Sequence, residues 1–179
     1  MARSFTEHLI SGEAELTSRW FSNRWELRAG GQVLASLRRL GRIHVSTVTL
    51  PDGSRWTLEP AGLSTVRAVE DPDREFARIT RRSWWGRRWE VAGPRFAYSL
   101  VSDPRPRRWR FEVGGSTIAV VSGSLVSYNT VHVAAQLALP LPALLLGWHV
   151  IARPWEAAAA PRGLVRAPRG PGEGPGPVS

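Results

Sequence analysis

The chain has 179 residues, 42% of them hydrophobic, which is enough for one domain with a sizeable core. It contains no cysteine, and this excludes disulfide bonds, thiol catalysis, iron–sulfur clusters and cysteine-bound zinc. The formal net charge is +9, and all 24 basic residues are arginine, as is typical of GC-rich bacterial genomes, so the arginine content alone does not establish an anionic partner.

The N-terminal residues lack the continuous apolar stretch of a secretory signal. We therefore expect an N-terminal arm over residues 1–15 and a cytoplasmic protein.

The region that follows favours short strands, because apolar residues recur at every second position. Trp25 and Leu27 alternate in this way, and a Gly-containing turn at 29–31 leads to a second alternating run through Leu37. Turn residues then recur at 51–54, 71–73, 93–94, 103–104 and 114–115. The strands expected among these turns contain residues 56–58, 66–69, 76–79, 89–91, 96–100, 109–113, 118–120 and 125–128. About ten to twelve such strands predict an antiparallel sandwich or barrel.

Leu137–Ala152 (LALPLPALLLGWHVIA) is an uncharged apolar run. Sixteen helical residues span roughly 24 Å, which is short of the ~30 Å hydrocarbon core of a bilayer. We therefore favour a buried core helix near residues 141–153, which begins at Pro142 and ends before Pro154, over a membrane-spanning or re-entrant segment.

The C-terminal residues 157–179 are dominated by proline and glycine and show no apolar period. Such a segment cannot offset its ordering entropy by burial, so we expect a disordered tail. The predicted domain therefore spans residues 16–156.

This order of features resembles the superfamily of tubby C-terminal domains, phospholipid scramblases and LURP-one-related proteins. The resemblance covers roughly residues 20–156. It is carried by the W-x-L and G-x-V strands, the LPLP entry into the helix, and D-x-x-G-like turns at residues 50–56 and 71–79. It implies a mainly β fold, a closed antiparallel barrel of about twelve short strands around a central buried C-terminal helix.

The resemblance also implies ligands. Scramblases carry an acidic calcium-binding segment before the buried helix, but residues 127–136 of this chain contain no carboxylate, so we do not expect calcium-driven scrambling. Tubby domains bind phosphoinositide headgroups with basic side chains, which here are arginines only.

Residues 74–110 carry a net charge of +8, from eleven arginines and three acidic residues. Within this stretch, RRSWWGRRWE (81–90) places three tryptophans among four arginines. Guanidinium groups bind phosphate through two hydrogen bonds, and tryptophan suits a lipid headgroup boundary or a stacked base. We therefore predict an anion- or lipid-binding surface that contains Arg81, Arg82, Arg87, Arg88, Arg105, Arg107 and Arg108.

The same pattern has a structural interpretation, in which the tryptophans face the core and the arginines lie along the outer wall and pair with glutamates. Residues 105–108 (RPRR) are likewise typical of a solvated loop tip. Nucleic acid is a further anionic partner, which we favour less than a lipid surface.

No enzyme pattern emerges. His8, His44, His132 and His149 lack the spacing of zinc ligands, and we expect His149 to be a neutral core residue. We predict no cofactor, no metal and no catalytic residue.

Our leading hypothesis is a non-catalytic module that binds anionic lipid or phosphoinositide at the inner membrane face, and the alternative is a soluble scaffold for an unidentified protein partner.

Overall fold

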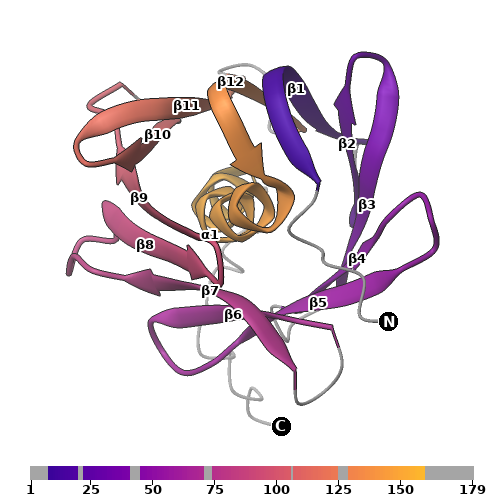
Figure 1. Cartoon of the computed structure of the whole chain (residues 1–179), viewed down its shortest axis with the longest axis horizontal. Coiled ribbons are helices and arrows are strands. Elements are labelled where there is room, and N and C mark those ends of the chain that lie inside the picture. The colour runs from indigo at the N-terminus through magenta and orange to yellow at the C-terminus, as the bar shows by residue number, and fades with distance from the viewer. Residues whose placement is uncertain are drawn as a thin grey trace, which may run out of the picture.

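The computed structural model describes residues 8–19, 22–40, 45–70, 74–105, 107–124 and 129–159, with only the backbone described for 153–159. Within these ranges, twelve strands form a closed antiparallel barrel and one helix fills it (Figure 1). The elements are β1 (Leu9–Ser18), β2 (Arg24–Ala29), β3 (Gln32–Leu40), β4 (Val45–Thr49), β5 (Arg55–Pro60), β6 (Thr65–Val69), β7 (Glu75–Arg81), β8 (Arg88–Gly93), β9 (Phe96–Ser102), β10 (Arg108–Val113), β11 (Ser116–Gly123), β12 (Thr130–Pro140) and α1 (Leu141–Ala159).

Each strand pairs with its neighbours in the chain, and β1 pairs with β12 to close the barrel. As the alternation predicts, every second side chain of a strand points into the barrel. In β2, Trp25 and Leu27 are buried while the residues between and beside them are exposed. Gly30 and Gly31 have positive φ angles of 55° and 80°, which the two-residue turn between β2 and β3 requires. The prediction of a closed antiparallel barrel is confirmed.

The helix α1 occupies the centre of the barrel, and every residue from Leu141 to Ala152 is buried. Trp148 contacts Trp25 edge-on at 5.4 Å between ring centroids, and the Arg39 guanidinium lies 4.6 Å from the centroid of the Trp148 ring. The buried central helix is therefore also confirmed. No helix among the described residues is long and apolar enough to cross a membrane.

The end of the helix was predicted wrongly, because α1 continues past Pro154 to Ala159. An interior proline removes one backbone hydrogen bond and crowds the preceding turn, which disfavours a helix locally, but the alanines that follow are strong helix formers. The predicted start agrees with the structure, because β12 ends at Pro140 and α1 begins at Leu141.

The N-terminal arm needs correction too, because residues 9–15 lie in β1 and pair with β12. A register shift between Ile10 and Gly12 breaks the alternation that would have revealed this strand. Residues 130–136, which we compared with the calcium-binding segment of scramblases, are part of β12. The expected strand at 125–128, the turn at 71–73 and the tail from 160 lie outside the described residues.

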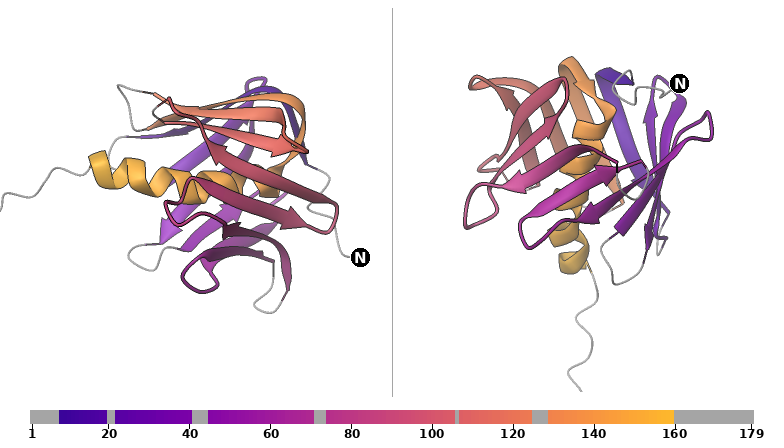
Figure 2. Two further views of the ribbon diagram at one scale, coloured as in Figure 1. Left: turned by 90° about the vertical axis from the view of Figure 1, so that its left-hand side faces the viewer. Right: turned by 60° about the horizontal axis from the view of Figure 1, so that its bottom comes forward.

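The two ends of the barrel differ in what they carry. We call the end where α1 begins the entry end; it holds the C-terminal ends of the even-numbered strands, and the Leu141 N–H donates to the His8 carbonyl there at 2.8 Å. The opposite end, where α1 leaves the barrel, is the exit end (Figure 2). It holds the C-terminal ends of the odd-numbered strands, including β7 and β9.

Candidate functional site

All seven predicted arginines lie at the exit end, on two adjacent hairpins. Residues 81–88 join β7 to β8, and residues 103–108 join β9 to β10; we call these segments the arginine loops, and Pro106 within them is outside the described residues. The Ser102 N–H donates to the Arg87 carbonyl at 2.8 Å, which ties the two loops together. The barrel topology thus assembles residues that are up to 27 positions apart in the sequence, from Arg81 to Arg108.

The three tryptophans of residues 81–90 are divided between the surface and the core. Trp84 and Trp85 stand at the tip of the hairpin, with 85% and 83% of their surface exposed. Trp89 is half-buried against the core, and its indole N–H donates to the Gly86 carbonyl at 2.9 Å. The interpretation in which the tryptophans face inward is therefore right for Trp89 and wrong for Trp84 and Trp85.

A third exposed apolar residue lies on the neighbouring connection. Leu63, between β5 and β6, is fully exposed. Its connection is held beside the arginine loops because the Arg81 N–H donates to the Ser64 carbonyl at 2.8 Å. We call Leu63, Trp84 and Trp85 the apolar tip.

The hairpin that carries the two exposed tryptophans is held by several hydrogen bonds. The Ser83 hydroxyl accepts the backbone N–H groups of Arg87 and Arg88 at 2.8 and 2.9 Å. The Gly86 N–H donates to the Ser83 carbonyl at 3.0 Å, and Gly86 has a positive φ of 66°. The tip therefore holds its indoles outward in a defined turn.

Only some of the seven predicted arginines form ion pairs with carboxylates. Arg82 pairs with Glu90, and the Arg108 Nε lies 3.7 Å from the Asp103 Oδ2. Arg107 donates to the Ser124 carbonyl on the next connection. In the part of the chain that the structure describes, the other four have no carboxylate partner: Arg81, Arg87, Arg88 and Arg105.

A cavity of about 370 Å³ lies between the arginine loops. Asp103 accepts the Arg105 N–H at 3.0 Å there, which fixes the loop backbone. The one non-glycine residue with a positive φ among the described residues, Arg107 at 56°, also borders this cavity. Its lining consists of Arg87, Ser102, Asp103, Pro104, Arg105, Arg107 and Trp109.

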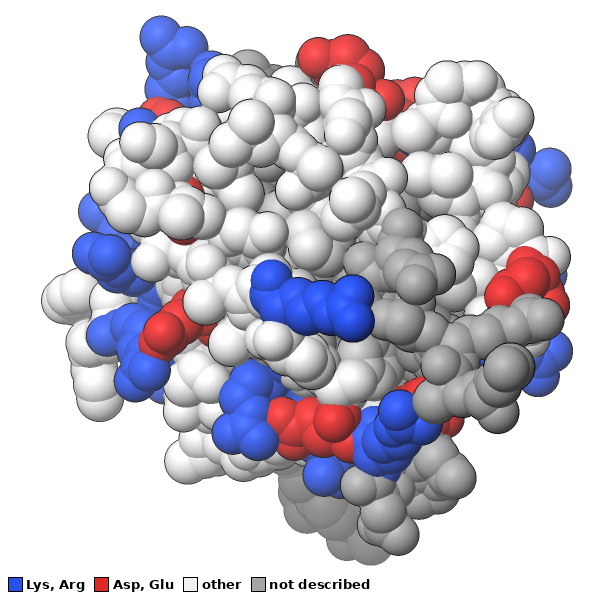
Figure 3. All heavy atoms as spheres, in the orientation of Figure 1, with Lys and Arg blue, Asp and Glu red and all other residues white. Residues whose placement is uncertain are grey.

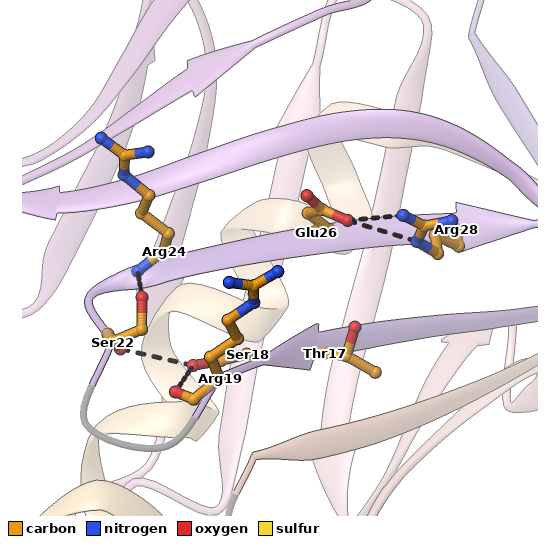
Figure 4. Close-up of a pocket in the computed structure, with 7 residues that line it drawn as sticks. All are labelled: Thr17, Ser18, Arg19, Ser22, Arg24, Glu26 and Arg28. Atoms are coloured by element: carbon orange, nitrogen blue, oxygen red, sulfur yellow. Dashed lines mark hydrogen bonds and ion pairs between the residues drawn. The ribbon is translucent and has the colours of Figure 1, made fainter.

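A second, larger cavity of about 760 Å³ lies on the opposite side of the exit end, where β1 and β2 meet (Figure 4). Arg28 turns toward Glu26 and forms an ion pair at 2.8 Å, whereas Arg19 and Arg24 have no carboxylate partner among the described residues. These two arginines were not among the predicted site residues, because they lie outside the arginine-rich stretch of residues 74–110. The spacing of the hairpins could have indicated them, because it places residues 19 and 24 at the same end of the barrel. The cavity is lined by Thr17, Ser18, Arg19, Ser22, Arg24, Glu26 and Arg28.

The entry end shows a different charge pattern. Glu70 lies 3.5 Å from Arg74, Glu112 lies 3.3 Å from Arg110, and Asp52 accepts the Ser54 N–H within its own turn. Figure 3 looks onto this end and shows acidic and basic side chains mixed around its periphery. Arg55 and Arg95 lie at this end without a carboxylate partner among the described residues, whereas the exit end has at least six such arginines, so more of the unpaired positive charge lies at the exit end.

The described histidines do not form a catalytic arrangement. His132 is exposed, 3.8 Å from Glu15, and His44 lies outside the described residues. His149 contacts the Ser46 hydroxyl at 3.1 Å through its Nδ1, but both residues are at most 1% exposed, so a substrate could reach them only if the barrel opened. No group of three or more potential metal ligands occurs among the described residues.

Comparison of the chain with models of protein families, with curated proteins and with solved structures found no match. The functional argument therefore depends on the geometry of the exit end.

Proposed function

We propose that this protein is a non-catalytic, tubby-like module that binds the anionic lipid surface at the cytoplasmic face of a membrane through its exit end. The observation that carries the proposal is the larger number of arginines without carboxylate partners, among the described residues, at the exit end than at the entry end. Four lie on the arginine loops, and Arg19 and Arg24 lie across the barrel rim. An extended anionic plane is the partner that contacts both sides of such a rim at once.

The physical argument is electrostatic. A basic side chain near an anionic membrane surface contributes about 1 kcal/mol, so three to six arginines supply roughly 3–6 kcal/mol. This attraction acts within a Debye length of about 10 Å at 0.1 M salt and weakens as salt rises. Guanidinium groups also form paired hydrogen bonds with phosphate oxygens, which fixes them at the headgroup level.

The proposal is tested by cosedimentation of the full chain with vesicles of phosphatidylcholine alone or mixed with phosphatidylglycerol, at low and high salt. We expect binding only to the mixed vesicles, and weaker binding at high salt. Failure to bind the mixed vesicles at low salt would refute the proposal and leave the soluble scaffold. Stronger binding to duplex DNA than to these vesicles would instead indicate nucleic acid as the partner.

A matched pair of variants separates a specific surface from net charge. The exit-end variant is R81Q/R87Q/R105Q, and the entry-end control is R55Q/R74Q/R95Q, which removes the same charge from exposed positions. At about 1 kcal/mol for each arginine, the exit-end variant should lose on the order of a hundredfold in vesicle affinity. Equal losses in the two variants would contradict docking through the exit end.

A further inference from the structure

The arginines of the exit end surround a feature that electrostatic attraction does not require, namely the apolar tip. Soluble proteins expose single apolar residues routinely, but here two adjacent tryptophans are each more than 80% exposed, and a fully exposed leucine lies on the neighbouring connection. The buried tryptophans of the same chain, Trp25, Trp56 and Trp148, are at most 4% exposed. The exposure of Trp84 and Trp85 is therefore a property of their position.

We infer that Trp84, Trp85 and Leu63 insert into the headgroup and acyl-chain boundary of the bilayer, so that the barrel stands with its exit end against the membrane. This inference rests on the proposed function and extends it, because it adds an apolar anchor to the charge attraction. It also fixes the orientation of the domain on the membrane.

The residues that flank the tip support a lipid boundary. Arg81 and Arg82 precede the tryptophan pair and Arg87 and Arg88 follow it, so each indole lies within four residues of guanidinium groups on both sides. Tryptophan prefers the membrane interface because its ring is apolar while its N–H is polar, and arginine reaches phosphate oxygens at the same depth. One hairpin thus presents both chemistries in the layered order that a bilayer surface has.

The turn geometry lowers the cost of insertion. The Ser83 hydroxyl and the Gly86 turn already hold the hairpin in one conformation, so little loop entropy is lost when the tip binds.

A second consequence follows from the topology. The helix α1 leaves the barrel at this same end (Figure 2), so its last described residues, through Ala159, face the membrane in the docked orientation.

The test uses the full chain and vesicles of phosphatidylcholine and phosphatidylglycerol that carry brominated acyl chains, which quench tryptophan at short range. We expect quenching in the parent protein and its loss in W84A/W85A. At high salt, where the arginines are screened, the double variant should bind about 30-fold or more weakly than the parent. The matched control is L9A/L137A, which removes two exposed apolar residues away from the exit end and should bind as the parent does.

The outcomes separate this inference from the proposed function. Salt-sensitive vesicle binding that W84A/W85A leaves unchanged, without quenching in the parent, would overturn insertion while the electrostatic proposal stands. Absence of any vesicle binding would refute both. Because both tryptophans are exposed, the double variant should unfold at the same denaturant concentration as the parent, and this measurement shows that a loss of binding is not a loss of folding.

Discussion

Gly147 lies where α1 packs tightly against the barrel wall, and replacing it with alanine tests how the helix packs there. A Cβ atom built at this position lies 2.6 Å from the Phe111 Cζ and 3.3 Å from a Leu100 methyl carbon. Both neighbours are fully buried, so neither ring nor methyl can move into solvent. Gly147→Ala therefore forces the helix or the β10 wall to shift.

The magnitude follows from two opposing effects. Overpacking a tight core costs about 1–3 kcal/mol, whereas alanine is favoured over glycine in a helix by about 1 kcal/mol. The difference is a net loss of up to about 2 kcal/mol in the free energy of unfolding, which corresponds to a fall of up to roughly 6 °C in Tm for a domain of this size. The assay is denaturant and thermal unfolding followed by circular dichroism.

The double variant G147A/F111L provides the control. Leucine lacks the Cζ atom that the new methyl group meets, so the two substitutions should compensate, and the double variant should lose at least about 0.5 kcal/mol less than the sum of the single variants. If G147A were more stable than the parent, or if the two effects were additive, the close approach of Gly147 to Phe111 would be wrong.

Two further predictions concern a buried serine and a half-buried tyrosine. Ser46→Ala removes the hydroxyl that contacts His149 at 3.1 Å in the core, and it should lower the free energy of unfolding by about 1–3 kcal/mol; an unchanged denaturation midpoint would contradict this contact. Burial raises the pKa of the Tyr98 phenol above its usual 10.0, so above pH 10 the unfolded chain loses this proton before the native chain does and stability falls as pH rises. Y98F should fall less steeply in the same range, and an ultraviolet titration in which the Tyr98 phenol ionises at or below pH 10 would refute the assignment.

The sequence was informative about the barrel wherever apolar residues alternate without interruption. Trp25 and Leu27 are an example, because apolar residues at every second position predict a β-strand with one buried face. β4 was not among the expected strands because its two buried positions hold Ser46 and Val48. Serine is polar, so the sequence shows no apolar alternation there. β1 was missed because of the bulge near Gly12. Long-range pairing partners, such as His149 for Ser46, leave no local pattern.

The candidate site was predictable in composition but not in orientation. The arginine positions were identified from charge density, and the topology then placed all seven at one end. Which tryptophan points outward depends on where the turn falls. The Ser83–Gly86 turn puts Trp84 and Trp85 outside the sheet and returns Trp89 to it, and a sequence of alternating Arg and Trp does not reveal that boundary.

Among the described strands, the seam between β1 and β12 joins the first in chain order to the last. The chain cannot complete this seam until Pro140 has been synthesised, and the helix that occupies the interior emerges later still. A nascent chain therefore holds eleven strands with neither their closing partner nor the side chains that fill the cylinder. Because such distant pairings form slowly, most of the native structure must be acquired after α1 has been synthesised, and any truncation before Leu141 should leave an open, aggregation-prone sheet.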